Sequence, residues 1–84
     1  MHQNSPNPFT KQTVFDFDIA QTGMVNLSIY NAYGELVKTL VNENKYAGSY
    51  QVMLDAENLR AGIYFYTLKT KEASVTKRMI LSNH

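Results

Sequence analysis

The sequence contains no cysteine and no tryptophan, and its two histidines, His2 and His84, lie within two residues of the chain ends. Without cysteine the chain can form no disulfide, no thiolate nucleophile and no cysteine-type zinc site. A general base or a metal ligand must be held in a fixed geometry, which chain ends do not provide. The residue types most often used in catalysis are therefore missing or badly placed.

The chain also lacks a large excess of either charge sign, and it lacks long apolar runs. Eight basic and seven acidic residues are scattered along the 84 positions and leave a net charge of +1. This predicts no basic patch for nucleic acid. The apolar runs are too short to cross a bilayer, so we expect no lipid insertion. Residues 1–4 lack the basic and apolar regions of a signal peptide, so we expect either an intracellular chain or a piece of a longer exported protein.

What the chain does contain is a repeated alternation of apolar and polar residues. Side chains two positions apart point to the same side of a strand, so each run offers one apolar face. The predicted inward residues are Phe15, Phe17, Ile19, Val25, Leu27, Ile29, Tyr50, Val52, Leu54, Tyr64, Tyr66, Leu68, Val75, Met79 and Leu81. Turn-forming residues separate the runs at short, regular spacing, which predicts a single all-β domain, a sandwich or a barrel.

One apolar segment, residues 34–41, fits a helical spacing as well as a strand. We expect a strand, because the segments on both sides are strands. A β-bulge in it would bring Val37 and Leu40 onto one face. The strand reading therefore predicts an irregular ladder at this point.

The first ten residues differ in kind from the rest. Pro6 and Pro8 flank Asn7, so the backbone is expected to be extended and to donate few hydrogen bonds. Phe9 is the expected anchor of this segment on the sandwich. We therefore divide the domain into an extended segment, residues 1–10, and a sandwich, residues 11–84.

Oxygen-bearing side chains gather after the fourth run, at Asp55, Glu57 and Asn58. Calcium binds oxygen-rich loops, but it needs six or more oxygens and usually a glycine at the bend. Asp and Asn also form such turns unaided, which is the interpretation we favour. Residues 55–59 are expected to form one helical turn, with Asp55 as its cap and Leu59 tucked inward.

Two further acidic residues, Asp16 and Asp18, share one strand face. Paired carboxylates can bind a cation or perform acid–base chemistry, but here they alternate with Phe15 and Phe17, as on a solvent-exposed face. The serines have no histidine placed to activate them, and the four glycines are spread singly. We predict no catalytic residue, no metal and no cofactor.

Aromatic residues are the one plentiful type that suggests a ligand. The tyrosines are Tyr30, Tyr33, Tyr46, Tyr50, Tyr64 and Tyr66. An exposed row of them could stack on a sugar ring. Alternation instead puts Tyr64 and Tyr66 on a core face, with their hydroxyls at its rim.

A basic pair, Lys77 and Arg78, interrupts the last apolar run. A strand places the two charges on opposite faces. Two interpretations of this pair are equally good. The charges can protect an edge strand against aggregation, or they can contact a partner protein.

Five stretches, in order across residues 4–81, resemble one family. They are Asn4-Ser5-Pro6-Asn7-Pro8-Phe9, Val25-Asn26-Leu27-Ser28-Ile29-Tyr30-Asn31-Ala32-Tyr33-Gly34-Glu35-Leu36-Val37, Ala47-Gly48 before Tyr50 and Val52, Asp55-Ala56-Glu57-Asn58-Leu59-Arg60-Ala61-Gly62-Ile63-Tyr64-Phe65-Tyr66, and Thr76-Lys77-Arg78-Met79-Ile80-Leu81. They are similar to motifs of the C-terminal sorting domains of type IX secretion substrates. The structural positions of these motifs are Gly34, Gly48, Asp55, Leu59, Gly62, Tyr64 and Tyr66.

The resemblance implies an immunoglobulin-like antiparallel β-sandwich of about seven strands. It implies a non-enzymatic secretion signal, which directs an attached N-terminal passenger through the periplasm and across the outer membrane of Bacteroidetes-type bacteria to the cell surface. The implied partners are the outer-membrane secretion machinery and its sortase-like protease. The residues that we expect to contact the machinery are Pro6, Asn7, Pro8, Phe9, Lys77 and Arg78.

Two other functions remain open from the sequence. One is an accessory module of a secreted enzyme, which binds carbohydrate or packs against a neighbouring domain. The other is a structural immunoglobulin-like domain of the flagellar hook-capping type, although such domains lack the Pro-Asn-Pro-Phe opening.

Overall fold

The computed structural model describes residues 3–4, 6–8, 11–56 and 59–82, and this part of the chain contains six β-strands and no helix. The strands are β1 (Gln12–Ile19), β2 (Gly23–Asn31), β3 (Leu36–Lys45), β4 (Gly48–Asp55), β5 (Gly62–Lys69) and β6 (Ser74–Leu81). Five of them coincide with the alternating runs and β3 with the ambiguous segment. A run with one apolar face is stable only when that face is covered, which two stacked sheets achieve. The all-β prediction is confirmed.

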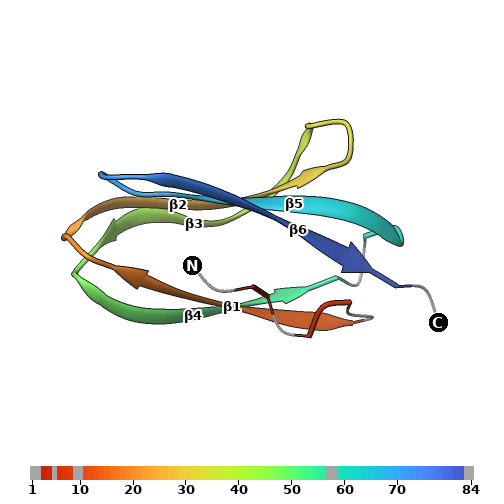
Figure 1. The fold of residues 1–84 in the computed structure, drawn as a ribbon, viewed down its shortest axis with the longest axis horizontal. Coiled ribbons are helices and arrows are strands. Elements are labelled where there is room, and N and C mark those ends of the chain that lie inside the picture. Colours follow the sequence, from red (N-terminus) through yellow and green to blue (C-terminus); the bar gives the residue numbers. More distant parts are fainter. Residues whose placement is uncertain (1–2, 5, 9–10, 57–58, 83–84) are drawn as a thin grey trace.

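The strands form two antiparallel sheets that face each other (Figure 1). β1 and β4 make a two-stranded sheet, and the other four strands make a sheet in the order β3-β2-β5-β6. The chain crosses from one sheet to the other after β1, after β3 and after β4. β6, the last strand in the sequence, is therefore an edge strand of the larger sheet.

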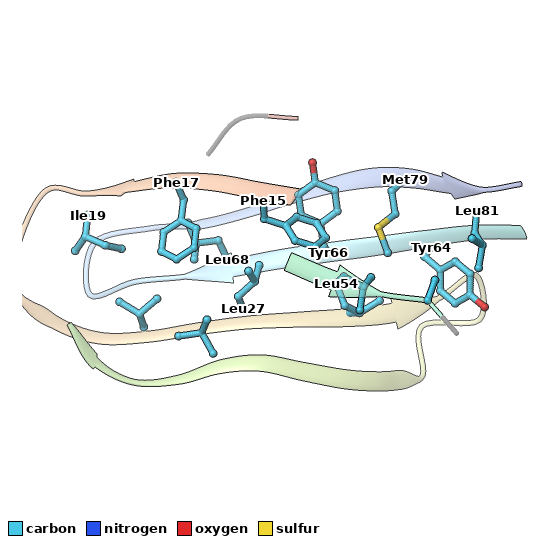
Figure 2. Close-up of a cluster of buried hydrophobic side chains, with 14 residues drawn as sticks. Phe15, Phe17, Ile19, Leu27, Leu54, Tyr64, Tyr66, Leu68, Met79 and Leu81 are labelled. Atoms are coloured by element: carbon cyan, nitrogen blue, oxygen red, sulfur yellow. The ribbon is translucent and has the colours of Figure 1, made fainter. Parts of the chain in front are cut away.

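The core lies between the sheets and consists of inward side chains from all six strands (Figure 2). The buried hydrophobic residues are Phe15, Phe17, Ile19, Val25, Leu27, Ile29, Val41, Leu54, Ala56, Tyr64, Tyr66, Leu68, Met79 and Leu81. The rings of Phe15 and Tyr66 meet edge to face across the two layers, with their centroids 4.7 Å apart. Tyr50 and Val52 are half-buried against this core, whereas Val75 is exposed because it lies near the start of the edge strand.

The pairing of β2 with β3 contains the irregularity that the sequence predicted. Leu27 pairs with Val41 and Ser28 with Thr39, so the ladder skips Leu40. A second shift, between Ile29 and Tyr30, skips a further residue of β3, Val37. Both skipped side chains are half-buried and pack on the core. Two bulges thus make the strand reading of this segment compatible with its helix-like spacing.

The strand count differs from the family expectation, since the described residues hold six strands and not seven. The described residues of the N-terminal segment, 3–4 and 6–8, form no strand, and their hydrogen bonds to β6 are made by the side chains of Gln3 and Asn7. Residues 6–8 form consecutive bends, so the expectation of an extended backbone is wrong for this part of the segment.

The helical turn expected over residues 55–59, with Asp55 as its cap, stays a prediction, because two of its residues are not described. Asp55 is the last residue of β4, and the backbone N–H of Leu59 donates to the Ala56 carbonyl at 3.0 Å. Leu59 is half-buried against the core, as predicted. Glu57 and Asn58 lie outside the described residues.

Candidate recognition surface

Asn4 anchors the N-terminal segment to the sandwich, and it is only 2% exposed. Its backbone N–H donates to the Tyr66 hydroxyl at 2.8 Å. Its side-chain amide donates to the Thr13 hydroxyl at 2.8 Å and to the Pro6 carbonyl at 3.1 Å. The fully buried Thr13 donates its own hydroxyl to the same carbonyl at 2.9 Å. Because Thr13 belongs to β1 and Tyr66 to β5, Asn4 joins the two sheets.

The sequence predicted that the Tyr66 hydroxyl would lie at the rim of the core. The structure places it instead beneath this segment, where it is buried. Burial raises its pKa above the ordinary value of 10.0, because the phenolate would lose its hydration. The hydrogen bond from the Asn4 backbone N–H opposes part of this rise in pKa. The hydroxyl is thus held in its neutral form as a structural partner of Asn4.

The same segment covers part of the free edge of β6. The side-chain amide of Gln3 donates to the Arg78 carbonyl at 2.8 Å. The backbone N–H of Ile80 donates to the side-chain oxygen of Asn7 at 2.9 Å. Residues more than 70 positions apart in the sequence therefore form one surface.

The structure brings together some of the residues that we expected to contact a partner. Pro6, Asn7, Pro8 and Arg78 are all exposed, and Asn7 and the Arg78 carbonyl take part in the two hydrogen bonds at the β6 edge. Lys77 is half-buried on the opposite face of β6, which agrees with the expected placement of the two charges. Phe9 lies outside the described residues, so its expected role as an anchor stays a prediction.

The turn between β2 and β3 accounts for one sequence motif. The side-chain oxygen of Asn31 accepts hydrogen bonds from the backbone N–H groups of Tyr33 at 2.9 Å and Glu35 at 3.0 Å. Gly34 has a φ of 83°, a conformation in which residues with a side chain are strained. Asn and Gly at these two positions therefore stabilise a tight connection between the strands.

The motif that leads into β5 also has a structural basis. The Tyr64 hydroxyl donates to the Arg60 carbonyl, four residues upstream, at 2.7 Å. Gly62 starts the strand with a φ of 151°, and Gly48 starts β4 with a similar φ of 153°. This hydrogen bond ties the connection from β4 to the start of β5.

The remaining polar candidates give no arrangement suited to catalysis. Asp18 accepts a hydrogen bond from the Ser49 hydroxyl at 2.6 Å on the exposed face of the two-stranded sheet. Within the described ranges, no three His, Cys, Asp or Glu residues lie close enough to share a metal ion. His2 and His84 are outside those ranges.

The exposed tyrosines do not form a row for sugar stacking. Tyr33 and Tyr46 are 89% and 79% exposed, but they precede and follow β3. A ten-residue strand spans about 30 Å, so one sugar ring cannot contact both. Tyr50 stacks instead on Phe17, with ring centroids 5.8 Å apart. The carbohydrate-binding alternative therefore finds no platform in these residues.

Comparison with protein-family models matches residues 5–82 to the secretion system C-terminal sorting domain. The chain belongs to this family. It is a C-terminal sorting signal for type IX secretion, and such a signal directs an attached passenger across the outer membrane to the cell surface. Comparisons with curated proteins and with solved structures give no significant match. None of the residues described in this sorting domain forms a helix that could span a membrane.

Sequence reasoning missed three residues that position this candidate surface: Gln3, Asn4 and Thr13. Thr13 did carry a signal, because it has the same strand parity as Phe15 and Phe17 and so places a hydroxyl on an apolar face. A buried hydroxyl needs a partner, and here that partner comes from Asn4. Nothing in the sequence identified which residue would supply it.

Proposed function

We propose that the secretion machinery reads this domain as a folded address, on the surface that the N-terminal segment forms with the edge of β6. The observation that carries the proposal is the pair of hydrogen bonds that join Gln3 to Arg78 and Asn7 to Ile80. A surface that is already ordered loses little conformational entropy when it binds. Arg78 supplies an exposed cation that can pair with a carboxylate of the machinery.

We place this surface in the context of a longer exported protein. The domain follows a passenger, passes through the periplasm with it, and is released by a sortase-like protease, while it performs no catalysis itself. The hydrogen bond from Tyr64 to Arg60 supports an immunoglobulin-like reading of the sandwich, since such folds often tie the start of a strand in this way.

The test is surface delivery of a reporter protein fused in front of the domain, measured by its accessibility to external protease. We expect Arg78→Ala to lower delivery about ten-fold, the loss of roughly 1.4 kcal/mol of binding for one charged contact. Lys38→Ala is the matched control, because Lys38 is an exposed cation on β3, at the other edge of the same sheet. Equal delivery of the two variants, both with unchanged melting temperatures, would refute this surface.

A further inference from the structure

The outer edge of β6 presents backbone groups beyond those that the N-terminal segment covers. The Arg78 carbonyl and the Ile80 N–H both point away from β5, since they bond to Gln3 and Asn7. The pairing of β5 with β6 runs without a register shift from Ser74 to Leu81. Alternate residues of an antiparallel edge strand point the same way, so the backbone N–H and carbonyl of Thr76 also face outward. In the described part of the chain no strand pairs with this edge.

The described residues of the N-terminal segment bond to one end of the β6 edge. These hydrogen bonds come from the exposed side chains of Gln3 and Asn7 and reach Arg78 and Ile80. Hydrogen bonds between exposed groups compete with water and contribute little net free energy. The firm attachment is at Asn4, whose partners lie in β1 and β5 and not in β6.

We propose that the β6 edge is an acceptor site for an extended strand of the secretion machinery, and that the described residues 3–4 and 6–8 form a strap over one end of it. The incoming strand pairs with the outward groups of Thr76 and of Ser74, which faces outward by the same alternation, so the hydrogen bonds of Gln3 and Asn7 to β6 stay in place. This inference rests on the proposed function and deepens it, because it names the structural class of the partner. Strand addition to an exposed edge uses backbone hydrogen bonds for affinity and side chains for selectivity.

Charge favours an extended strand of a different protein as the occupant. A second copy of the domain fits less well, because antiparallel pairing of two β6 strands about Lys77 or about Arg78 would place that cation directly opposite its own copy. A foreign strand with a carboxylate beside the exposed Arg78 would instead form a cross-strand ion pair.

The acceptor edge is tested by removing one outward backbone donor. Thr76→Pro deletes the outward N–H, and an edge strand tolerates proline on its solvent side. Thr76→Ala is the matched variant, because both lose the hydroxyl contact with Thr67 and only the proline loses the N–H. We expect reporter delivery at least ten-fold lower for Thr76→Pro than for Thr76→Ala. If Thr76→Pro fails to fold by thermal melting, Ser74→Pro against Ser74→Ala makes the same comparison.

Equal delivery of the proline and alanine variants would overturn the acceptor edge and leave the sorting role intact. If the unmodified domain fails to deliver its reporter, the proposed function itself is refuted. The two failures are therefore distinguishable in one experiment. Light scattering of the purified Asn4→Ala domain, in which the attachment of the strap is weakened, tests which chain occupies the β6 edge. A monomer supports a strand of another protein, and a concentration-dependent dimer would show that a second copy occupies the edge.

The strap is tested by amide hydrogen exchange in the purified domain. The Ile80 N–H bonds to the strap, whereas the neighbouring Met79 faces β5. We expect the Ile80 amide to exchange at least ten-fold faster than the Met79 amide, because the strap opens without global unfolding. Asn7→Ala should accelerate exchange at Ile80 further and leave Met79 unchanged. Equal exchange rates at the two amides in the unmodified domain would refute the strap.

Discussion

Replacing Asn4 by alanine tests whether one buried amide holds the N-terminal segment to the sandwich. The change removes the two hydrogen bonds that the amide donates, to the Thr13 hydroxyl and to the Pro6 carbonyl, and the one that its oxygen accepts from the Gln3 side chain. The bond from the backbone of residue 4 to Tyr66 can persist, because it does not involve the side chain. The Thr13 hydroxyl also keeps its bond to the Pro6 carbonyl, so it is not left without a partner.

The magnitude follows from the two donated bonds, because the exposed Gln3 side chain can bond to water in place of Asn4. A hydrogen bond between neutral groups contributes about 0.5–1.5 kcal/mol net, so we expect a loss of about 1–3 kcal/mol in the free energy of unfolding. A domain of this size loses about 4–8 °C of melting temperature per kcal/mol, so a loss near the middle of the range is about 10 °C or more. Urea unfolding and thermal melting measure the two quantities.

Asn7→Ala is the control, because Asn7 is exposed and accepts one bond, from Ile80. We expect it to cost about 0.5 kcal/mol or less, as is typical of surface changes. A double-mutant cycle of Asn4→Ala with Thr13→Val should show a coupling of about 1 kcal/mol, since the two side chains share a bond. Equal stability of the Asn4 and Asn7 variants, or additivity in the cycle, would show that the amide does not hold the segment.

Two further perturbations test the buried hydroxyl and the turn. The pKa of Tyr66 is raised above 10.0, so the stability that its neutral form contributes is complete below about pH 10 and is lost as the pH rises through the raised value. Tyr66→Phe should therefore be less stable than the unmodified domain at pH 8. Its free energy of unfolding, measured with urea, should fall less steeply with pH between pH 9 and about 11. Equal slopes of free energy against pH in the two proteins would contradict this. Gly34→Ala should cost about 1–2 kcal/mol in urea unfolding, because φ is 83° there although a Cβ would meet nothing within 4 Å. Gly23→Ala, where a Cβ makes only ordinary contacts with the Lys71 side chain and φ is not positive, should be close to neutral, and equal costs would argue against backbone strain.

Much of the fold could be predicted because strand periodicity is local. Phe15 and Phe17 point inward because residues two apart share a face, and this holds whatever strand lies beside them. The bulges at Val37 and Leu40 were also predictable, since both residues are apolar and only an irregular ladder brings them to the core. Val75 has the same pattern but is exposed, because its burial depends on its place at the edge of the sheet.

The candidate recognition surface was predictable only in part. The motifs that contain Asn7 and Ile80 singled out both ends of the chain, but these residues are 73 positions apart and the sequence does not say that they meet. Their meeting requires β6 to be an edge strand, which is a property of the strand order. The family match over residues 5–82 identifies the role of the domain and not the surface that carries it out.

The sequence by itself determined that this chain is an all-β domain with the motifs of a type IX sorting signal, because periodicity and motif spacing are properties of the chain alone. Only the tertiary structure decided that Asn4 joins β1 to β5 beneath the surface and that Gln3 and Asn7 cover the edge of β6. Hydrogen-bond partners distant in sequence are chosen by how the sheets stack. The absence of cysteine sharpens this point, because such polar contacts take the place of a covalent link in holding the two ends of the chain together.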